Sequence, residues 1–553
     1  MGESLRSPAR LDPTGPVASL THREPRRGEN LVIWTLWLTY GSFYFCRQNL
    51  STVVLAIESP VEQGGLGLTG EQVGWILASS KIAYGLGQLL NGQLSERFSP
   101  RLMLAIGMFG SAALNVLFGL SEGFFFLLFV WATNGFCQSL GWSPCVRVAA
   151  NWVPIARRGK AIGIIGTGYQ ITQGLTYIVA GQAAARLGWR GAMYVPAAML
   201  AAAGLFMLIF LRDQPAEQTS DDAASQGSDF TRSLKLPFSE SLYWTLFNPA
   251  LWLLGLALGL LNACRYGFLD WGVKHLMTTR DLKVDKATLQ FFVIAIGATA
   301  GSYLAGWATD RFFGSRRAPV VCFLMALLGG LALLYDSPVT ETPAGLMSLL
   351  VVIGFCIFGP QVLLVGTAPA DLAHRGTSAA AAGFVNFMGY MGAATGDVVT
   401  GYYSSSGAGG WQKAITIWAI WAFAGSAVTA ILWNTTSQRL KLIPGWVPRL
   451  GGIVTLGAAG VALYYGNQPE LLWMVTIAAW ACLLGAFANR WLAAPALAAA
   501  IAGVLTVFIS LVQSRTGASW PESLGLVSFG LTAILSLMIL VEREPEAAAS
   551  VPH

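Results

Sequence analysis

Long apolar segments follow one another along most of the chain and are separated by short polar stretches. Twelve lie at about 31–56, 70–92, 102–120, 124–148, 160–183, 190–212, 249–273, 287–308, 317–336, 344–368, 378–402 and 411–433, and four more at about 450–466, 470–488, 493–513 and 523–541. A helix needs roughly 20 apolar residues to cross the hydrocarbon core of a bilayer. The pattern therefore predicts an all-α polytopic membrane protein with sixteen spans, the last four separate from the rest.

Composition agrees with this class. The 553 residues are 54% hydrophobic and 11% charged, whereas about a quarter of the residues in a soluble domain are charged. The net charge of +6 is small and spread over the loops, which favours orientation in membrane lipid and argues against nucleic acid. The seven cysteines lie almost wholly in apolar segments without CxxC spacing, so we expect packing residues and neither a metal site nor a disulfide framework. We also expect no cofactor.

The first twelve segments read as two copies of one six-helix unit. Landmarks recur at a near-constant offset: Arg265 lies 218 residues after Arg47, Gly306 lies 214 after Gly92, and Pro360 lies 216 after Pro144. Arg47 and Arg265 thus occupy equivalent places in the first helix of each copy. A charge inside a span costs about 3 kcal/mol or more and usually has a function. Two facing guanidinium groups predict a site for a dianion.

Loop charges predict the orientation and the domains. Basic residues fall mostly in alternate connections, which the positive-inside rule places in the cytoplasm. We therefore expect both termini to be cytoplasmic in a plasma (inner) membrane protein. The expected units are a cytoplasmic tail at 1–30, a six-helix bundle at 31–212, a polar cytoplasmic linker at 213–245, a second bundle at 246–436, and a four-helix membrane appendix with its tail at 437–553.

Two cytoplasmic loops carry related motifs. One contains Gly92, Glu96, Arg97 and Arg101, and the other contains Gly306, Asp310 and Arg311. Glycine permits close helix approach, and the charged residues can latch helix ends in one conformation. The alternative is an ordinary basic loop, which two copies at the repeat offset disfavour. The motifs resemble the loop motif of the major facilitator superfamily, which implies two bundles around a central cavity and alternating access.

Residues within the spans narrow the resemblance. They are Tyr40, Tyr44, Arg47 and Asn49, then Tyr84, the stretch Gly141-Trp142-Ser-Pro144, the stretch Arg265-Tyr266-Gly-Phe-Leu-Asp270-Trp271, Phe358-Gly-Pro360 and Gly389-Tyr390. Across residues 30–433 these look like the organophosphate:phosphate antiporters, which include glycerol-3-phosphate and hexose-6-phosphate transporters. The resemblance implies Arg47 and Arg265 as a phosphate clamp. Guanidinium chemistry agrees, because its planar fork of donors matches two phosphate oxygens.

Three positions depart from this family. Gln88 stands where the glycerol-phosphate and hexose-phosphate carriers have a lysine, while Lys81 lies seven residues earlier on the same helical face. Lys81 is a candidate substrate contact, or a lysine that reaches the interface or pairs with a helix acid. Tyr169 replaces a histidine of the glycerol-phosphate carriers, and Asn262 replaces a tyrosine. These changes place glycerol-3-phosphate in doubt and indicate a rebuilt pocket for the organic group.

Each of the other polar and aromatic candidate site residues has a functional and a structural interpretation. Tyr44, Tyr84, Trp142, Tyr169 and Tyr390 either line the cavity as donors or only pack, as aromatic residues in apolar helices commonly do. Asp397 in the eleventh span is a candidate proton or cation coupling site, or a structural pair or cap. Asp270, near the end of its helix, either contacts substrate or has a polar role at the helix end.

These features predict a secondary transporter that exchanges a phosphorylated small metabolite for inorganic phosphate. An alternative is a sensor that binds a sugar phosphate without transport and signals to a membrane partner, for which the four C-terminal helices offer a docking element. An enzyme in that appendix is disfavoured, because residues 450–541 contain no histidine, one cysteine and few carboxylates.

Overall fold

The computed structural model describes residues 28–153, 155–215, 238–313, 316–374, 377–407, 409–433, 442–466, 470–513 and 520–542. Regular structure within these ranges is entirely helical. Most of the predicted N-terminal tail, the centre of the predicted linker and the last eleven residues lie outside the described part of the chain.

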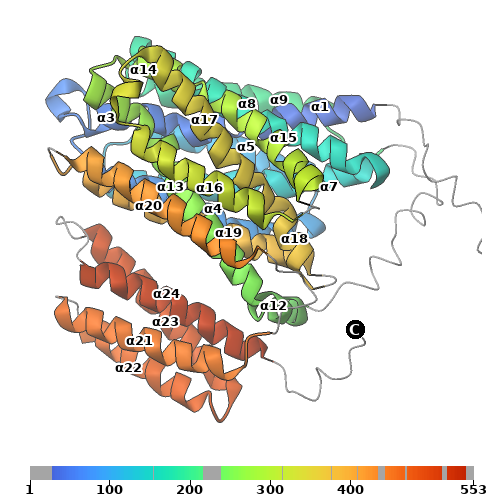
Figure 1. Ribbon diagram of the computed structural model, residues 1–553, viewed down its shortest axis with the longest axis vertical. Coiled ribbons are helices and arrows are strands. Elements are labelled where there is room, and N and C mark those ends of the chain that lie inside the picture. Colours follow the sequence, from blue (N-terminus) through green and yellow to red (C-terminus); the bar gives the residue numbers. More distant parts are fainter. Residues whose placement is uncertain are drawn as a thin grey trace, which may run out of the picture.

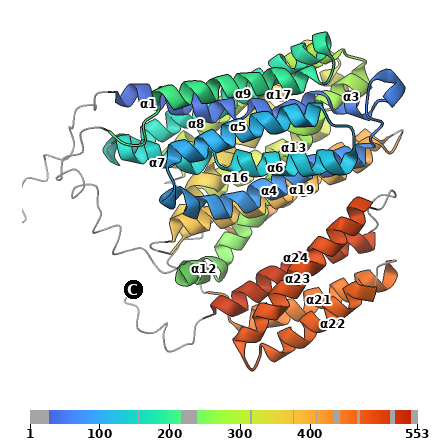
Figure 2. The same ribbon diagram turned by 180° about the vertical axis from the view of Figure 1, so that it is seen from behind.

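The first six helical segments form one bundle (Figures 1 and 2). Their bounds are α1 Glu29–Ser42, α2 Phe45–Gln48, η2 Asn49–Thr52 and α3 Val54–Glu58 for the first segment, then α4 Gly70–Arg97, α5 Pro100–Gly119, α6 Phe124–Ser139 with α7 Trp142–Trp152, α8 Ile155–Leu187 and α9 Gly191–Phe210. The prediction of one continuous first span is wrong, because α1 ends at Ser42 and the segment continues as three short pieces.

Side chains from neighbouring helices stabilise this break. A helix interruption frees backbone carbonyls, and a polar backbone group within a membrane needs a partner from the protein. The Cys46 carbonyl accepts from the side-chain amides of Asn115 at 3.3 Å and Asn134 at 3.0 Å. The Phe43 carbonyl accepts from Gln138 Nε2 at 3.0 Å. Polar residues on α5 and α6 thus provide donors for the carbonyls immediately before Arg47.

The second bundle repeats the first with a different first helix. It comprises α13 Pro249–Arg280, α14 Val284–Phe291 with α15 Ile294–Phe312, α16 Ala318–Leu334, α17 Pro343–Val362 with a π-helical turn at Leu363–Thr367 and α18 Ala368–Leu372, α19 Ser378–Ser404, and α20 Gly410–Ile431. Arg265 therefore lies within an unbroken 32-residue helix, whereas Arg47 lies on a four-residue one.

Close glycine contacts join the elements that carry the site. At Gly392 of α19, a Cβ atom would fall 2.4 Å from the Gly259 Cα on α13, so these helices touch backbone to backbone. At Gly74 of α4, a Cβ would lie 2.8 Å from the Asp397 carbonyl oxygen. Small residues permit such approach between membrane helices. The contact between α4 and α19 brings the two bundles together beside Asp397.

Helices occupy every predicted apolar segment. Within the described residues, ten helical segments are long and apolar enough to cross a membrane, and Ala318–Leu334 and Leu472–Gly485 are shorter apolar helices. The helices α4, α8 and α19 have ample length, with 28, 33 and 27 residues, but are not among the ten. Each carries polar side chains toward the interior, which lowers its mean hydropathy.

Four C-terminal helices stand beside the two bundles as a separate unit (Figures 1 and 2). They are α21 Trp446–Tyr465, α22 Glu470–Gly485, α23 Ala493–Gln513 and α24 Trp520–Val541. The unit meets the core near α12, Phe238–Leu246, where the Ile443 N–H donates to the Phe247 carbonyl at 2.9 Å. Met538 of α24 is buried in the core cluster. The domain boundaries given above remain predictions.

Candidate functional site

Arg47 is held by both hydrogen bonds and aromatic rings. Its Nε donates to Gln138 Oε1 at 3.1 Å, and an Nη donates to the Tyr44 hydroxyl at 3.1 Å. The guanidinium carbon lies 4.5 Å from the centroid of the Tyr44 ring and 4.3 Å from that of Tyr84. Cation–π contacts and neutral acceptors orient the group without neutralising its charge.

Arg265 is more deeply buried and less well satisfied. Its residue exposure is 3%, and its guanidinium carbon lies 4.9 Å from the Tyr266 ring centroid and 4.6 Å from that of Phe358. Among the described residues, its Nε has no hydrogen-bond partner. A buried charged donor without an acceptor is costly. An anion beside Arg265 would remove that cost.

An aromatic cluster connects the two arginines. Tyr44 and Tyr390 lie within electrostatic range of both guanidinium groups. Tyr169 stacks on Tyr44 at 5.1 Å between centroids, and Trp142 contacts Tyr40 at 4.8 Å. The structure therefore brings together the five aromatic candidates of the sequence, with Tyr84 meeting Tyr390 at 4.5 Å.

The space beside Arg47 is lined from both bundles. About 410 Å³ of space between atoms, including its mouth, is bounded by Arg47, Gln48, Leu77, Ser80, Lys81, Tyr84, Trp131, Asn134, Gly135, Gln138, Tyr266, Asp270 and Tyr390. Arg265 is not among these lining residues and lies next to Tyr266 in the chain. The two arginines do not face each other across one open space in this conformation.

Gln88 and Asn262 are the two other positions that differ from the family. Gln88 donates to the Ser139 carbonyl at 3.3 Å and is not among the cavity-lining residues. Asn262 is buried on α13, and its Oδ1 has no hydrogen-bond partner among the described residues. Its amide lies close to Gly389. Asn262 therefore offers a free acceptor, whereas Gln88 is occupied by the backbone.

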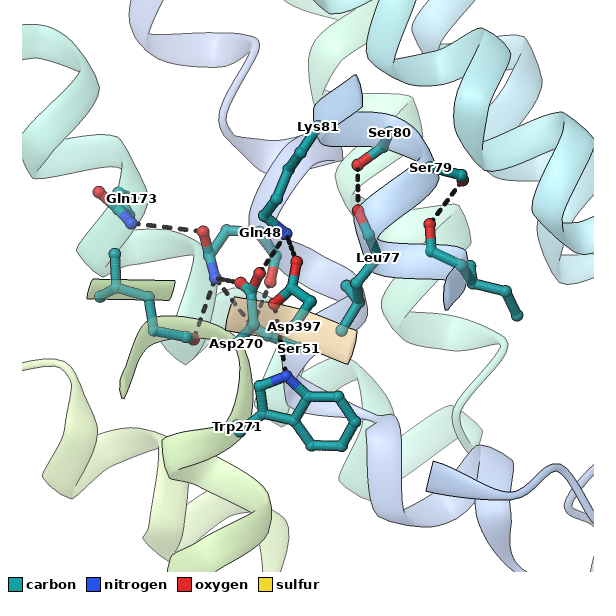
Figure 3. A network of polar contacts seen from close by, with 12 residues as sticks. Gln48, Ser51, Leu77, Ser79, Ser80, Lys81, Gln173, Asp270, Trp271 and Asp397 are labelled. Carbon is teal, nitrogen blue, oxygen red and sulfur yellow. Dashed lines mark hydrogen bonds and ion pairs between the residues drawn. The ribbon is translucent and has the colours of Figure 1, made fainter. Parts of the chain in front are cut away.

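Lys81 lies between two acids of the opposite bundle (Figure 3). Its Nζ lies 2.5 Å from Asp270 Oδ2 and also forms an ion pair with Asp397. The Asp270 Oδ1 accepts from Gln48 Nε2 at 2.5 Å. This is the pairing with helix acids that the sequence left open for Lys81. Asp270 is buried in this contact and does not have a simple polar role at a helix end.

Further contacts join the bundles toward the end that loop charges predict to be extracytoplasmic, here called the outer end. Lys274 of α13 forms an ion pair with Glu58 at 2.7 Å. The Gly70 N–H donates to Ser405 Oγ at 3.0 Å, and the Tyr177 hydroxyl donates to the Leu269 carbonyl at 2.8 Å. These contacts hold the outer ends of the two bundles together.

The first loop motif is partly visible in the structure. At the end of α4, the structure describes only the backbone of Gly92, Glu96 and Arg97. The backbone N–H of Arg101 donates to Asp213 Oδ1 at 2.9 Å, and its guanidinium donates to the Leu208 carbonyl. Arg101 therefore links α5 to the end of α9 within the same bundle.

In the second motif, charged residues link helix ends, whereas the glycine makes no close contact. Asp310 pairs with Arg317 at 2.8 Å, and Arg317 also approaches Asp371 at 3.4 Å, while Arg311 is exposed on α15. A Cβ at Gly306 would meet nothing within 4 Å, so the expected close helix approach at this glycine is wrong. Gly301 and Gly297, five and nine residues earlier on α15, make that contact with α17.

Sequence reasoning missed two polar residues of the site. Gln138 orients Arg47, and Gln48 joins Asp270 to α8 because its Oε1 accepts from Gln173 Nε2 at 3.3 Å. Uncharged amides inside predicted spans are a usable signal, because an amide in an apolar helix needs a partner.

The fold and the site define a multi-pass membrane transporter built from two related bundles. The chain belongs to the Major Facilitator Superfamily, whose family model matches residues 36–396. That match ends before α21–α24. The superfamily consists of transporters and not of enzymes.

The relatives place the chain near the organophosphate:phosphate antiporters. A probable hexose phosphate transport protein of Chlamydia trachomatis is 29% identical over 74% of this chain and 92% of its own length. The glycerol-3-phosphate transporter of Bacillus subtilis is 29% identical over 65% and 82%, and the membrane sensor protein UhpC of Escherichia coli is 28% identical over 66% and 82%.

A solved structure supports the fold independently. The crystal structure of an inward-facing bacterial homologue of the human lysosomal transporter Spinster matches with a TM-score of 0.58 at 15% identity, over 74% of this chain and 96% of that one. At this identity, the likeness concerns the fold alone.

Proposed function

We propose that the protein exchanges an organophosphate for inorganic phosphate by alternating access. The single observation that carries this proposal is the pair of arginines at repeat-equivalent positions, one in each bundle, packed against aromatic rings without a carboxylate partner in the described contacts. Arg265 supports it most directly, because its buried Nε has no acceptor. The names of the hexose phosphate and glycerol-3-phosphate relatives agree with the same substrate class.

The geometry suggests how binding changes the conformation. Arg47 borders the cavity while Arg265 lies beyond its lining, so a dianion bound at Arg47 would draw the two bundles together to reach Arg265. Binding that is stronger in the closed state favours closure. An empty site keeps two positive charges that repel each other. The transporter should therefore change conformation more readily with substrate bound than without it. Each return step then needs a second substrate, which gives exchange.

The surroundings favour a substrate with one phosphate and an uncharged organic part. Two arginines match the charge of a phosphate monoester, whereas Lys81 is already held by Asp270 and Asp397. Tyr169 interacts with both arginines, and Asn262 lies about one helical turn before Arg265 on α13, so both contribute polar groups without charge. A sugar phosphate fits this pattern better than a substrate with an additional carboxylate, which would need a third cation.

We also propose the placement of the protein in its membrane. The charge pattern supports a plasma (inner) membrane location with both ends of the chain in the cytoplasm. The four helices α21–α24 would cross the bilayer as an appendix, since three of them contain candidate spans and α22 includes a shorter apolar helix.

A sensor function is the second candidate. The likeness to the membrane sensor protein UhpC favours it, as does the separate unit of α21–α24, which offers a surface for a membrane partner. A sensor would bind a sugar phosphate without moving it.

Counterflow separates the two candidates. Proteoliposomes that contain the full chain and unlabelled phosphate should take up labelled phosphate, and unlabelled phosphate esters should compete in the order of their affinity. Arg47→Lys and Arg265→Lys should each abolish uptake, because lysine keeps the charge and loses the fork of donors. Arg190→Lys is the matched control, since Arg190 pairs with the exposed Glu122 away from the site. Saturable ester binding without uptake would favour the sensor. Normal uptake in either of the two site variants would refute the clamp.

A further inference from the structure

The charge cluster of Lys81, Asp270 and Asp397, here called the ion triad, contains one more acid than base. The three side chains are 8%, 5% and 0% exposed. Lys81 comes from the first bundle and both aspartates come from the second. Burial of an unbalanced carboxylate is unfavourable. With both acids ionised, the triad would therefore carry one unbalanced negative charge, although it is nearly inaccessible to solvent.

Uncharged groups surround the triad on most sides. From α2, Gln48 donates to Asp270 at 2.5 Å. From α13, the Trp271 indole N–H donates to Asp397 Oδ1 at 3.4 Å, and the Tyr266 ring lies 4.6 Å from Lys81 Nζ. From α8, Tyr177 interacts electrostatically with Asp270 while its hydroxyl bonds to a carbonyl. None of these contacts supplies a balancing cation.

Within the described residues, no ion pair joins the nearest other cations to the triad. Arg47 lines the same cavity as Asp270, and Arg265 lies five residues before Asp270 on α13. Both keep their charge at any physiological pH. Lys274, one turn beyond Asp270, is paired with Glu58 of α3. Because no described ion pair joins either arginine to Asp270 or Asp397, the contacts of the triad leave one negative charge in excess.

The two carboxyl groups are also close to each other. Both lie against the same ammonium group of Lys81. Two carboxylates that share a site rarely ionise together, and the pair then holds one proton between them. A proton on Asp397 would donate to Asp270 and leave one lysine, one carboxylate and one neutral acid.

We propose that the ion triad is a proton-binding site that is occupied while the outer ends of the bundles are closed and emptied when they separate. Closure removes the aspartates from water and favours the neutral triad. Separation moves Lys81 of α4 away from Asp270 of α13 and Asp397 of α19, hydrates the acids and releases the proton. Proton binding therefore stabilises the closed outer end, and a rise in pH promotes its opening. This inference does not depend on the identity of the transported substrate.

The distance between the outer ends tests the proposal directly. Spin labels at Gln63→Cys and Ser406→Cys would report the separation of the two bundles, since both positions are exposed at the outer end. The full chain in nanodiscs, without phosphate, should show an open-to-closed ratio that rises with pH, by up to about tenfold per pH unit for one linked proton. Asp397→Asn should hold the short distance at every pH, because the amide mimics the protonated acid.

Glu58→Gln is the matched control. It also removes an ion pair between the bundles, with Lys274, but leaves the triad complete. Its open fraction should differ from that of the parent protein and should still change with pH. A distance that does not depend on pH in the parent protein, or an unchanged pH response in Asp397→Asn, would overturn the proposal.

Infrared difference spectra give a second measurement that does not require movement. The carbonyl band of a protonated carboxylic acid should be present in the closed protein and absent in Asp397→Asn. Asp397→Glu retains a carboxyl group and should retain the band, which guards against misfolding of the asparagine variant. Absence of the band from the closed parent protein would refute the proton site. Loss of phosphate exchange alone would not, because neither measurement uses phosphate.

Discussion

Tyr84 of α4 and Tyr390 of α19 pack with ring centroids 4.5 Å apart across the interface of the two bundles. The guanidinium group of Arg47 lies over the Tyr84 ring, 4.3 Å from its centroid. The pair thus closes one side of the arginine site, and it must separate when the bundles move apart.

Loss of the Tyr390 ring should weaken substrate binding more than loss of its hydroxyl. An aromatic pair contributes roughly 0.5–1.5 kcal/mol beyond its buried area. We expect Tyr390→Ala to raise the KM of phosphate exchange about threefold to tenfold, and Tyr390→Phe to change it by less than about twofold. Initial rates of counterflow over a range of phosphate concentrations measure both. Equal effects of the two variants would assign the contact to the hydroxyl.

A carboxylate in place of Gln138 should inactivate the site by neutralising Arg47. The Gln138 Oε1 accepts from Arg47 Nε at 3.1 Å, so Gln138→Glu would place a negative charge there at nearly unchanged size. We expect exchange to fall at least about a hundredfold, because an internal ion pair would compete with the anion. Gln138→Leu, which adds no charge, should retain more activity. The opposite ranking would show that Arg47 does not need to remain unpaired.

The broken first segment should depend on Asn134. Its amide donates to the Cys46 carbonyl at 3.0 Å and its Oδ1 accepts from Ser111 at 2.6 Å. Asn134→Leu removes both hydrogen bonds and leaves the Cys46 carbonyl with only the longer bond from Asn115, which should cost about 1–3 kcal/mol. A fall in the thermal midpoint of the purified protein would measure this. Thr133→Val, at a half-buried neighbour whose hydroxyl bonds only within its own helix, should change the midpoint little.

Two glycines should respond in opposite ways to alanine. At Gly392, a Cβ would overlap the Gly259 backbone on α13, whereas at Gly306 it would meet nothing within 4 Å. Gly392→Ala should lower stability by at least about 1–3 kcal/mol through overpacking. Gly306→Ala should be neutral or slightly stabilising, because alanine favours a helix. Size-exclusion profiles after graded heating would distinguish them, and tolerance at Gly392 would mean that the two helices can shift apart.

The sequence predicted the parts of this structure that depend on hydropathy and repetition. The membrane class, the helical segments and the equivalence of Arg47 and Arg265 follow from apolar length and from a constant offset. The break after Ser42 could not be predicted this way, because the residues directly at it, Phe43 to Cys46, are apolar or aromatic. Its cause lies in Asn115, Asn134 and Gln138, which are distant in the chain.

The ion-pair partners of charged residues also could not be predicted from the sequence pattern. Lys81 has suitable acids 189 and 316 residues further along the chain, and helical periodicity gives its face but not the helix opposite. The second loop motif shows the same limit. Asp310 bonds to Arg317, which also approaches Asp371, and the loop sequence alone does not give these partners.

The interruption of the first segment gives the two arginines unequal freedom of movement. Arg47 is attached to a helix of four residues bounded by a 3-10 turn, so its backbone can adjust while α1 stays in place. Arg265 is part of a rod of 32 residues whose backbone touches α19, and it can move only when that rod moves. Any anion that binds both would meet one compliant contact and one rigid contact. Differences in ligand shape would then be absorbed on the side of Arg47, while Arg265 would transmit the displacement to the whole second bundle.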